Sequence, residues 1–206
     1  MKKFLFMSMF SIMLFLSFSL VGAAESNSYP NAKDIESMNN ELEELVEQAN
    51  KQLEQGVTNV ELTSGDLSLI FKENNEEKVS NKYLNLTNNF AVAAAGSKSY
   101  QAYVLNTSGF NFRHGVSGTF SWDSKGILTA VTGDEDLSGV AYSRSGSTTV
   151  AMRDGRLGID AKVGRVTSKA TFTPLKYVPF PFYTKIIVDV YGPTQEYRID
   201  TATITQ

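Results

Sequence analysis

Residues 182–191 read FYTKIIVDVY, and this stretch shows most clearly how the chain folds. Ile186, Val188 and Val190 occupy alternate positions, and Lys185 and Asp189 are among their neighbours. Successive side chains of a strand point to opposite faces, so the alternation predicts a strand with one buried face. Similar runs follow Gly96 and are separated by turn-forming residues about every ten positions, which is typical of antiparallel β proteins.

The region after Gly96 therefore predicts a series of strands joined by short turns. We expect these strands at residues 98–106, 116–123, 127–132, 137–144, 147–153, 156–163, 166–173, 182–191 and 195–204. Asp154-Gly155 predicts a two-residue hairpin, Ser145-Gly146 is a weaker turn signal, and residues 123–126 suit a type I turn that ends in a left-handed glycine. Short connections favour antiparallel neighbours, so we expect a mainly β fold, an antiparallel sandwich or barrel with meander-like order.

One amphipathic helix is predicted before this region, at residues 32–55. Its apolar residues recur at helical spacing: Ile35, Met38, Leu42, Leu45, Val46, Ala49 and Leu53. Asn31 is expected to cap the helix, with Asp34 completing a capping box. Gly56 is expected to end it.

Charge divides the chain after residue 24 into two segments. Residues 25–95 hold 13 Asp and Glu against 5 Lys, a formal charge of −8, and should contain the helix and two strands at 57–63 and 67–72. Residues 96–206 hold 12 Lys and Arg against 9 Asp and Glu, a formal charge of +3, and should form the β domain. The opposite signs are compatible with contact inside one globular unit and also with two ordinary solvated surfaces.

Residues 1–24 have the three-part pattern of a secretory signal peptide. Lys2-Lys3 precedes an apolar run from Phe4 to Val21, and small residues follow, with cleavage expected after Ala24. The run is also about as long as a membrane span, so a retained anchor is the alternative. After cleavage we expect no stable membrane span and a secreted, extracellular protein. The absence of cysteine in an exported chain favours a bacterial source and a fold held by its core alone.

Several chemistries find little support in the composition. The chain has no cysteine and one histidine, His114, and this composition disfavours a Ser-His-acid triad and a zinc site. A lone histidine at the start of a strand is most simply a surface or packing residue. The basic residues are interleaved with acids and the net charge is −3, which disfavours nucleic acid as a partner. Paired carboxylates such as Asp134, Asp136 and Asp160 leave a hydrolase as an alternative. We assign no catalytic residue.

The segment from Asp134 to Gly139 resembles the opening of a calcium loop. Asp134, Asp136 and Ser138 would supply oxygen ligands, and Gly139 would allow the turn that directs them at one ion. Position 12 of such a loop would be Ser145 rather than glutamate, so an EF-hand is not predicted. A calcium-binding turn is one hypothesis and a polar connecting loop is the other. No other cofactor is expected.

Two further segments suggest sites of contact or processing. Pro179 and Pro181 exclude a central strand, so the aromatic residues around them are expected either to cap the open end of the sandwich or to contact an extracellular glycan, lipid or protein. These residues are Tyr177, Phe180, Phe182 and Tyr183. The small-residue run that ends at Ala95 suggests a protease site if it is exposed, or a buried segment if it is not.

These observations predict a secreted, non-enzymatic binding or structural module of a bacterium with an unassigned ligand. One alternative is the proprotein of a secreted effector or antimicrobial polypeptide, cleaved near Ala95. The other is an extracellular hydrolase that uses paired carboxylates.

Overall fold

The computed structural model describes residues 31–74, 95–107, 111–139, 142–175 and 180–206. The elements in chain order are α1 (Ala32–Glu54), β1 (Asn59–Ser64), β2 (Leu67–Asn74), β3 (Gly96–Asn106), β4 (Phe112–Trp122), β5 (Leu128–Val131), β6 (Asp134–Ser138), β7 (Tyr142–Met152), β8 (Val163–Pro174), β9 (Phe182–Tyr191) and β10 (Glu196–Thr205). The predicted signal peptide, its cleavage site at Ala24, and Tyr177 lie outside the described residues.

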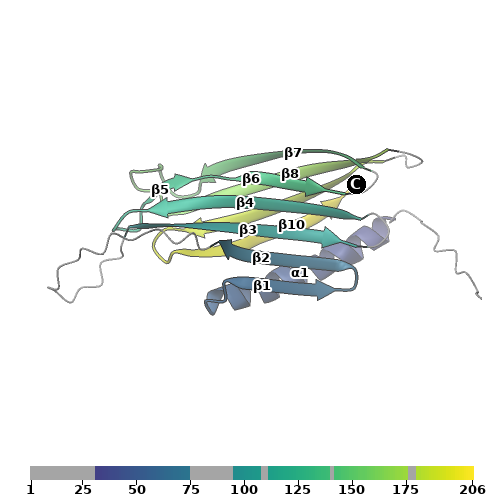
Figure 1. Cartoon of the computed structure of the whole chain (residues 1–206), viewed down its shortest axis with the longest axis horizontal. Helices are drawn as coiled ribbons and strands as arrows, with labels where there is room; N and C mark the ends of the chain where they lie inside the picture. Colours follow the sequence, from purple (N-terminus) through teal and green to yellow (C-terminus); the bar gives the residue numbers. More distant parts are fainter. Residues whose placement is uncertain (1–30, 75–94, 108–110, 140–141, 176–179) are drawn as a thin grey trace, which may run out of the picture.

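The strands form two antiparallel sheets, which confirms the predicted mainly β fold (Figure 1). The larger sheet has the order β1-β2-β3-β4-β5, with β6 pairing to β4 beside β5. The smaller sheet has the order β10-β9-β8-β7. Strands that follow each other in sequence are therefore neighbours in both sheets, and β6 is the exception. Two separate sheets make this a sandwich rather than one closed sheet.

The core lies between the two sheets and is rich in aromatic side chains. Phe112 of β4 packs against Phe172 of β8 and Phe182 of β9, with ring centroids 5.2 Å from each. Phe172 and Phe182 stack on each other at 4.9 Å. Ile186 and Val188 of β9 are also buried, as their alternation predicted. Side chains of both sheets thus fill one hydrophobic core without any disulfide.

Helix α1 closes one long side of the sandwich (Figure 1), where it packs against β10, β1 and β2. The predicted capping box is present: Asn31 Oδ1 accepts from the backbone N–H of Lys33, and the Asp34 carboxylate accepts from the backbone N–H of Asn31. The predicted apolar stripe is buried at Leu42 and Leu45. The helix therefore shares the core of the β domain.

Two asparagines of α1 bind the free edge of β10. Asn39 Nδ2 donates to the carbonyl of Ile204 at 2.8 Å, and Asn39 Oδ1 accepts from the Ile204 N–H at 2.9 Å. Asn50 makes the same pair of bonds with Ile199, at 2.8 Å and 2.9 Å. An edge strand carries backbone groups that lack a ladder partner. The two amides satisfy such groups and so replace part of a neighbouring strand.

The predicted strand at 156–163 is wrong, and so is the two-residue hairpin at Asp154-Gly155. Strands β7 and β8 do pair, but residues 153–162 form a long connection between them. Asp154 Oδ1 accepts from the backbone N–H groups of Lys162 and Val163, and Asp160 Oδ1 accepts from that of Arg156. These side-chain bonds close a loop, although the alternating apolar residues in it imitate a strand.

Two other predicted boundaries also differ from the structure. The strand expected at 137–144 is divided between β6 and β7, and Ser145-Gly146 lies inside β7 rather than in a turn. Strand β2 continues through Glu73 and Asn74, two residues beyond the predicted end at residue 72. In contrast, the turn at 123–126 is confirmed, because Gly126 has a φ of +75° and donates to the Asp123 carbonyl.

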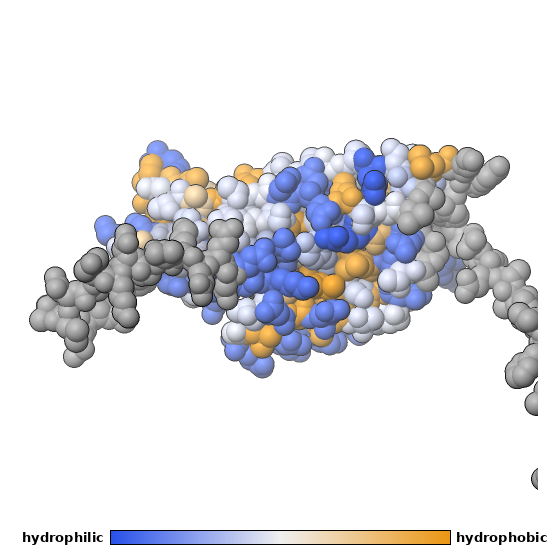
Figure 2. Space-filling view, viewed as in Figure 1, coloured by the Kyte–Doolittle hydropathy of each residue, from blue (hydrophilic) through white to orange (hydrophobic). Residues whose placement is uncertain are grey.

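The surface drawn in Figure 2 is mostly polar, with apolar residues in small, separate patches. None of the helices in the described ranges has the length and apolar character required to cross a bilayer.

Candidate functional site

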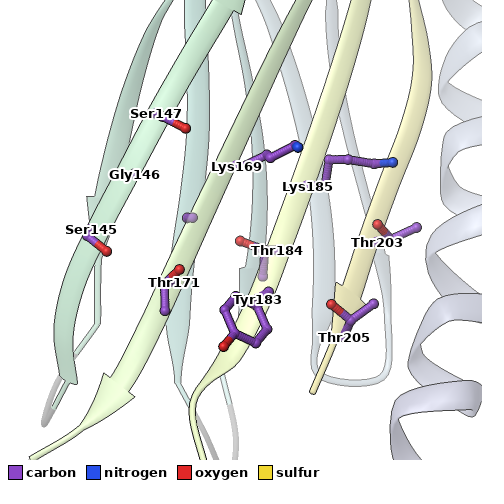
Figure 3. A pocket seen from close by; sticks show the side chains of 11 residues that line it. Ser145, Gly146, Ser147, Lys169, Thr171, Tyr183, Thr184, Lys185, Thr203 and Thr205 are labelled. Atoms are coloured by element: carbon purple, nitrogen blue, oxygen red, sulfur yellow. The ribbon is translucent and has the colours of Figure 1, made fainter.

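The best candidate site is a hollow on the outer face of the smaller sheet (Figure 3). It has a volume of about 470 Å³ and takes side chains from all four strands. We call it the lysine hollow and define its outward-facing lining as Ser145, Ser147, Lys169, Thr171, Tyr183, Lys185, Thr203 and Thr205. These positions face outward because their sequence neighbours, such as Ser168, Ala170 and Ile186, are buried in the core.

The register of the strands arranges these side chains in two parallel rows. One row runs Ser145, Thr171, Tyr183 and Thr205 across β7, β8, β9 and β10. The next row runs Ser147, Lys169, Lys185 and Thr203. Neighbouring strands lie about 4.8 Å apart and alternate residues of a strand about 7 Å apart, so the two rows cover a floor of roughly 14 by 7 Å.

Lys169 and Lys185 are direct cross-strand partners in the centre of this floor. Within the described part of the chain, neither ammonium group takes part in an ion pair or hydrogen bond, and no carboxylate lines the hollow. Figure 3 shows both side chains extending across the sheet in the same direction. Like charges directly opposite each other destabilise a sheet. An anion in the hollow would relieve this repulsion.

The hydroxyl groups of the hollow are also available to a ligand. Among the described residues, no hydrogen bond to another side chain or to the backbone is made by the hydroxyls of Ser145, Ser147, Thr171, Tyr183, Thr203 and Thr205. Paired hydroxyls on the larger sheet behave differently, because Ser99 and Thr119 lie 2.8 Å apart and bond to each other. A hydroxyl both donates and accepts, so the hollow presents a dense set of donors and acceptors.

The predicted aromatic contact residues separate into two groups. Tyr183 is 44% exposed and lines the lysine hollow, and Phe180 is 66% exposed three residues before it. Phe182 points to the opposite face of β9 and is buried in the core. Of the predicted contact residues within the described ranges, Phe180 and Tyr183 are therefore the two that a ligand can reach.

The charges at the other end of the same face are fully paired. Asp189 is 1% exposed, and its carboxylate accepts from Arg153 Nη1 at 2.9 Å and from Arg165 Nε at 2.7 Å. Arg165 also contacts Asp200 at 2.8 Å. This cluster stabilises a buried carboxylate. Lys169 and Lys185 differ from this cluster, because no described carboxylate pairs with either of them.

His114 lies in the core rather than at the surface, because β4 begins at Phe112, four residues before the predicted strand. Its Nε2 is 2.9 Å from Ser168 Oγ, and its Nδ1 is 2.7 Å from Thr184 Oγ1. Burial lowers the pKa of His114 from 6.5 to about 4, so the ring is neutral at pH 7. The neutral ring lies between two hydroxyls of the smaller sheet and so links the two sheets. Because His114 and Ser168 are both fully buried, a substrate could not reach Ser168 as a nucleophile.

The residues of the calcium hypothesis lie on strand β6 rather than in a loop. Asp134, Asp136 and Ser138 alternate with Glu135 and therefore share one face of the strand. Asp136 already forms an ion pair with Arg113. In the described ranges, no group of three or more His, Cys, Asp or Glu is placed to hold a metal ion. Calcium binding stays a prediction, and any ion here would compete with Arg113.

Ala95, the expected processing site, is exposed and immediately precedes β3. Residues 67–74 of β2 pair with residues 99–106 of β3 along their whole length. A cut at Ala95 would thus fall between two paired strands of one sheet.

No family model, curated protein or solved structure matches this chain.

The sequence contains a signal for the lysine hollow that is a pattern along the strands rather than a short motif. Hydroxyl residues occupy alternate positions on three strands, at 143–149 in β7, 167–173 in β8 and 201–205 in β10, with Lys169 replacing one of them. Outward-facing Ser and Thr with this period of two indicate a polar sheet face. The meeting of Lys169 with Lys185 depends on the β8–β9 register, which no local pattern gives.

Proposed function

We propose that this protein is an extracellular, non-enzymatic binding module that holds a polar ligand in the lysine hollow. The proposal rests on Lys169 and Lys185, which are neighbours across two strands and have no described counter-charge. Hydroxyl groups with no described partner surround them, and the exposed ring of Tyr183 lies next to them. A sheet gains nothing for its own stability from two facing lysines. A bound partner would give them a role.

The architecture supports binding rather than catalysis at this face. Among the residues that the structure describes, lysines, hydroxyls and one tyrosine line the hollow, and none of the lining residues is a histidine or carboxylate that could act as a general acid or base. The floor is formed by four strands with paired backbones, which provides a rigid surface. Preorganised side chains on such a surface lower the entropic cost of binding. The signal-peptide pattern of residues 1–24 supports the proposed extracellular location.

Affinity electrophoresis against a panel of neutral and acidic polysaccharides tests this proposal. We expect at least one polysaccharide to retard the protein, with retardation reduced in Lys185→Ala and in Tyr183→Ala. Lys72→Ala is the matched control, because Lys72 is an exposed lysine on the larger sheet. Retardation that is equal in all variants, or absent with every polysaccharide, would refute the lysine hollow as a binding site. Shorter chains in the recovered polysaccharide would refute the non-enzymatic assignment.

The proprotein alternative has one observation in its favour, the exposure of Ala95. The contacts across that point weigh against release. Asn39 and Asn50 of α1 bind β10, and β2 pairs with β3. A cleaved N-terminal segment would remain attached by these bonds and by the shared core.

A further inference from the structure

We infer that the ligand of the lysine hollow is an acidic polysaccharide, with one acidic group between Lys169 and Lys185 and a sugar ring against Tyr183. This inference rests on the proposed function and specifies its ligand class.

The charge of the hollow indicates an anionic ligand. Lys169 and Lys185 are register partners on the neighbouring strands β8 and β9 without a described counter-charge, whereas Arg153 and Arg165 at the far end of the same face are paired with Asp189. Two ammonium groups on neighbouring strands suit a carboxylate, phosphate or sulfate group that accepts a hydrogen bond from each.

The aromatic ring and the hydroxyls indicate that the anion is carried by a sugar. Tyr183 precedes Lys185 by two residues on β9, so its ring lies about 7 Å along the strand from the lysine pair. A pyranose ring has an apolar C–H face, which can pack on an aromatic ring, and an edge of hydroxyls, which can bond to side chains. Five Ser and Thr hydroxyls surround these groups on β7, β8 and β10. They complement the hydroxyl edge.

The shape of the site favours a chain over a compact anion. The hollow crosses four strands on an open sheet face, and its two rows of side chains run parallel to each other from β7 to β10. A single phosphate would engage the two lysines and leave both Ser145 and Thr205, at opposite ends of a row, without a partner. A polymer with hydroxyls on either side of its acidic group reaches both ends.

An anionic membrane is the main competing ligand, because Leu175 and Phe180 are exposed apolar residues on the segments that precede β9. Apart from the ring of Tyr183, the outward-facing side chains that line the hollow in the described ranges belong to Ser, Thr and Lys. A surface rich in hydroxyls suits a hydrated sugar better than a lipid interface. We therefore favour the polysaccharide and use vesicles as a separate arm of the test.

The test compares charged and neutral forms of the same sugar chain by isothermal calorimetry. The probes are polygalacturonate with its methyl ester, and phosphomannan with dephosphorylated mannan. We expect polygalacturonate or phosphomannan to bind more tightly than its neutral form, and the affinity to fall with added salt. Lys169→Ala and Lys185→Ala should each weaken binding by roughly three- to tenfold, as expected for one charged hydrogen bond near the surface.

Variants at Tyr183 separate a sugar from other polyanions. Tyr183→Phe should keep most of the affinity, whereas Tyr183→Ala should lose about tenfold, because the ring supplies the contact. Lys72→Ala should bind like the wild type, and polyglutamate should bind weakly and be insensitive to Tyr183→Ala. Far-UV circular dichroism of each variant identifies any loss of folding, and variants that unfold are replaced by Lys169→Gln and Lys185→Gln.

The outcomes that overturn the inference differ from those that overturn the proposed function. Equal binding of charged and neutral chains, still dependent on Tyr183 and Lys185, would remove the acidic ligand and keep the hollow as a binding site. Polyglutamate or phosphatidylglycerol vesicles that bind more tightly than every sugar chain, with dependence on the lysines, would also overturn the sugar and keep the site. Binding that no substitution in the hollow changes would overturn both.

Discussion

Lowering the pH should destabilise the folded protein through His114. Its pKa falls from 6.5 in the unfolded chain to about 4 in the core, so the unfolded state takes up the proton first. The contribution of the neutral ring is fully present above pH 6.5, decreases as the pH falls from 6.5 to about 4, and changes no further below that. A difference of roughly two and a half pKa units at 1.36 kcal/mol each corresponds to about 3 kcal/mol.

Urea unfolding at a series of pH values measures this effect. Trp122, the single tryptophan, is 5% exposed in the folded state and reports unfolding by fluorescence. Carboxylates also titrate below pH 5, so the His114 term is obtained as the difference between wild type and His114→Gln. The glutamine amide can bond to Ser168 and Thr184 but does not titrate in this range. We expect the wild type to lose about 3 kcal/mol more than the variant between pH 7 and pH 4.

A direct titration of the ring provides the decisive control. The chain contains one histidine, so its imidazole proton resonances in the NMR spectrum need no further assignment. A midpoint near pH 6.5 in the folded protein, or the same stability slope in wild type and His114→Gln, would contradict the argument from burial. The NMR titration uses the wild-type protein, so it tests the pKa of His114 even if His114→Gln does not fold.

Three further predictions concern the helix, the processing site and calcium. Asn50→Ala should lower the free energy of unfolding by about 1–3 kcal/mol, because it leaves both backbone groups of Ile199 without their partner. Asn40 is exposed, so Asn40→Ala should change this free energy little. Equal effects of the two substitutions in urea unfolding would contradict the edge-binding role of Asn50. Cleavage after Ala95 should leave two fragments that elute together in size-exclusion chromatography, and separation without denaturant would show that the shared core is weaker than its contacts suggest. Millimolar calcium should shift the melting temperature only slightly, because Asp136 is already paired; a large rise by calorimetry that EDTA reverses and that Asp136→Asn removes would instead establish a calcium site.

The fold was predictable because its main signals are local. The alternation of Ile186, Val188 and Val190 and the helical spacing of Leu42 and Leu45 each place apolar side chains on one face, and all five are buried. The capping box at the start of α1 is also a short-range pattern. Where a helix or strand buries one face, the spacing of its apolar residues along the sequence is enough to identify it.

The same kind of signal failed where side chains bond to the backbone. Leu157 and Ile159 alternate as in a strand, yet they are 44% and 61% exposed. Asp154 and Asp160 accept backbone N–H groups and so hold residues 153–162 in a loop. Apolar alternation alone does not record this competition between side-chain and ladder hydrogen bonds.

The candidate site was less accessible to sequence reasoning than the fold. The aromatic segment around Pro179 and Pro181 predicts Tyr183 as a contact residue, and Tyr183 does line the lysine hollow. No local pattern marks Lys169 or Lys185 as a site residue, because each is an ordinary outward-facing strand residue in its own sequence context. Their pairing arises from a register between strands separated by a connection. For His114 the sequence predicts a surface or a packing residue, and the early start of β4 at Phe112 makes it a packing residue.

The paired asparagines of α1 also reveal a match between two different repeats. Asn39 and Asn50 are eleven positions apart, which is close to three helical turns and about 16 Å of rise, and Ile199 and Ile204 are five positions apart, also about 16 Å along a strand. Inserting one residue between the two asparagines would rotate one amide by about 100° away from the strand. In a regular strand the backbone groups of alternate residues point to the same edge, so residues five apart would point to opposite edges. The pairing irregularity between Ile199 and Thr201 lets Ile199 and Ile204 face the same edge, and the spacing of the two asparagines is therefore matched to this one break in the strand.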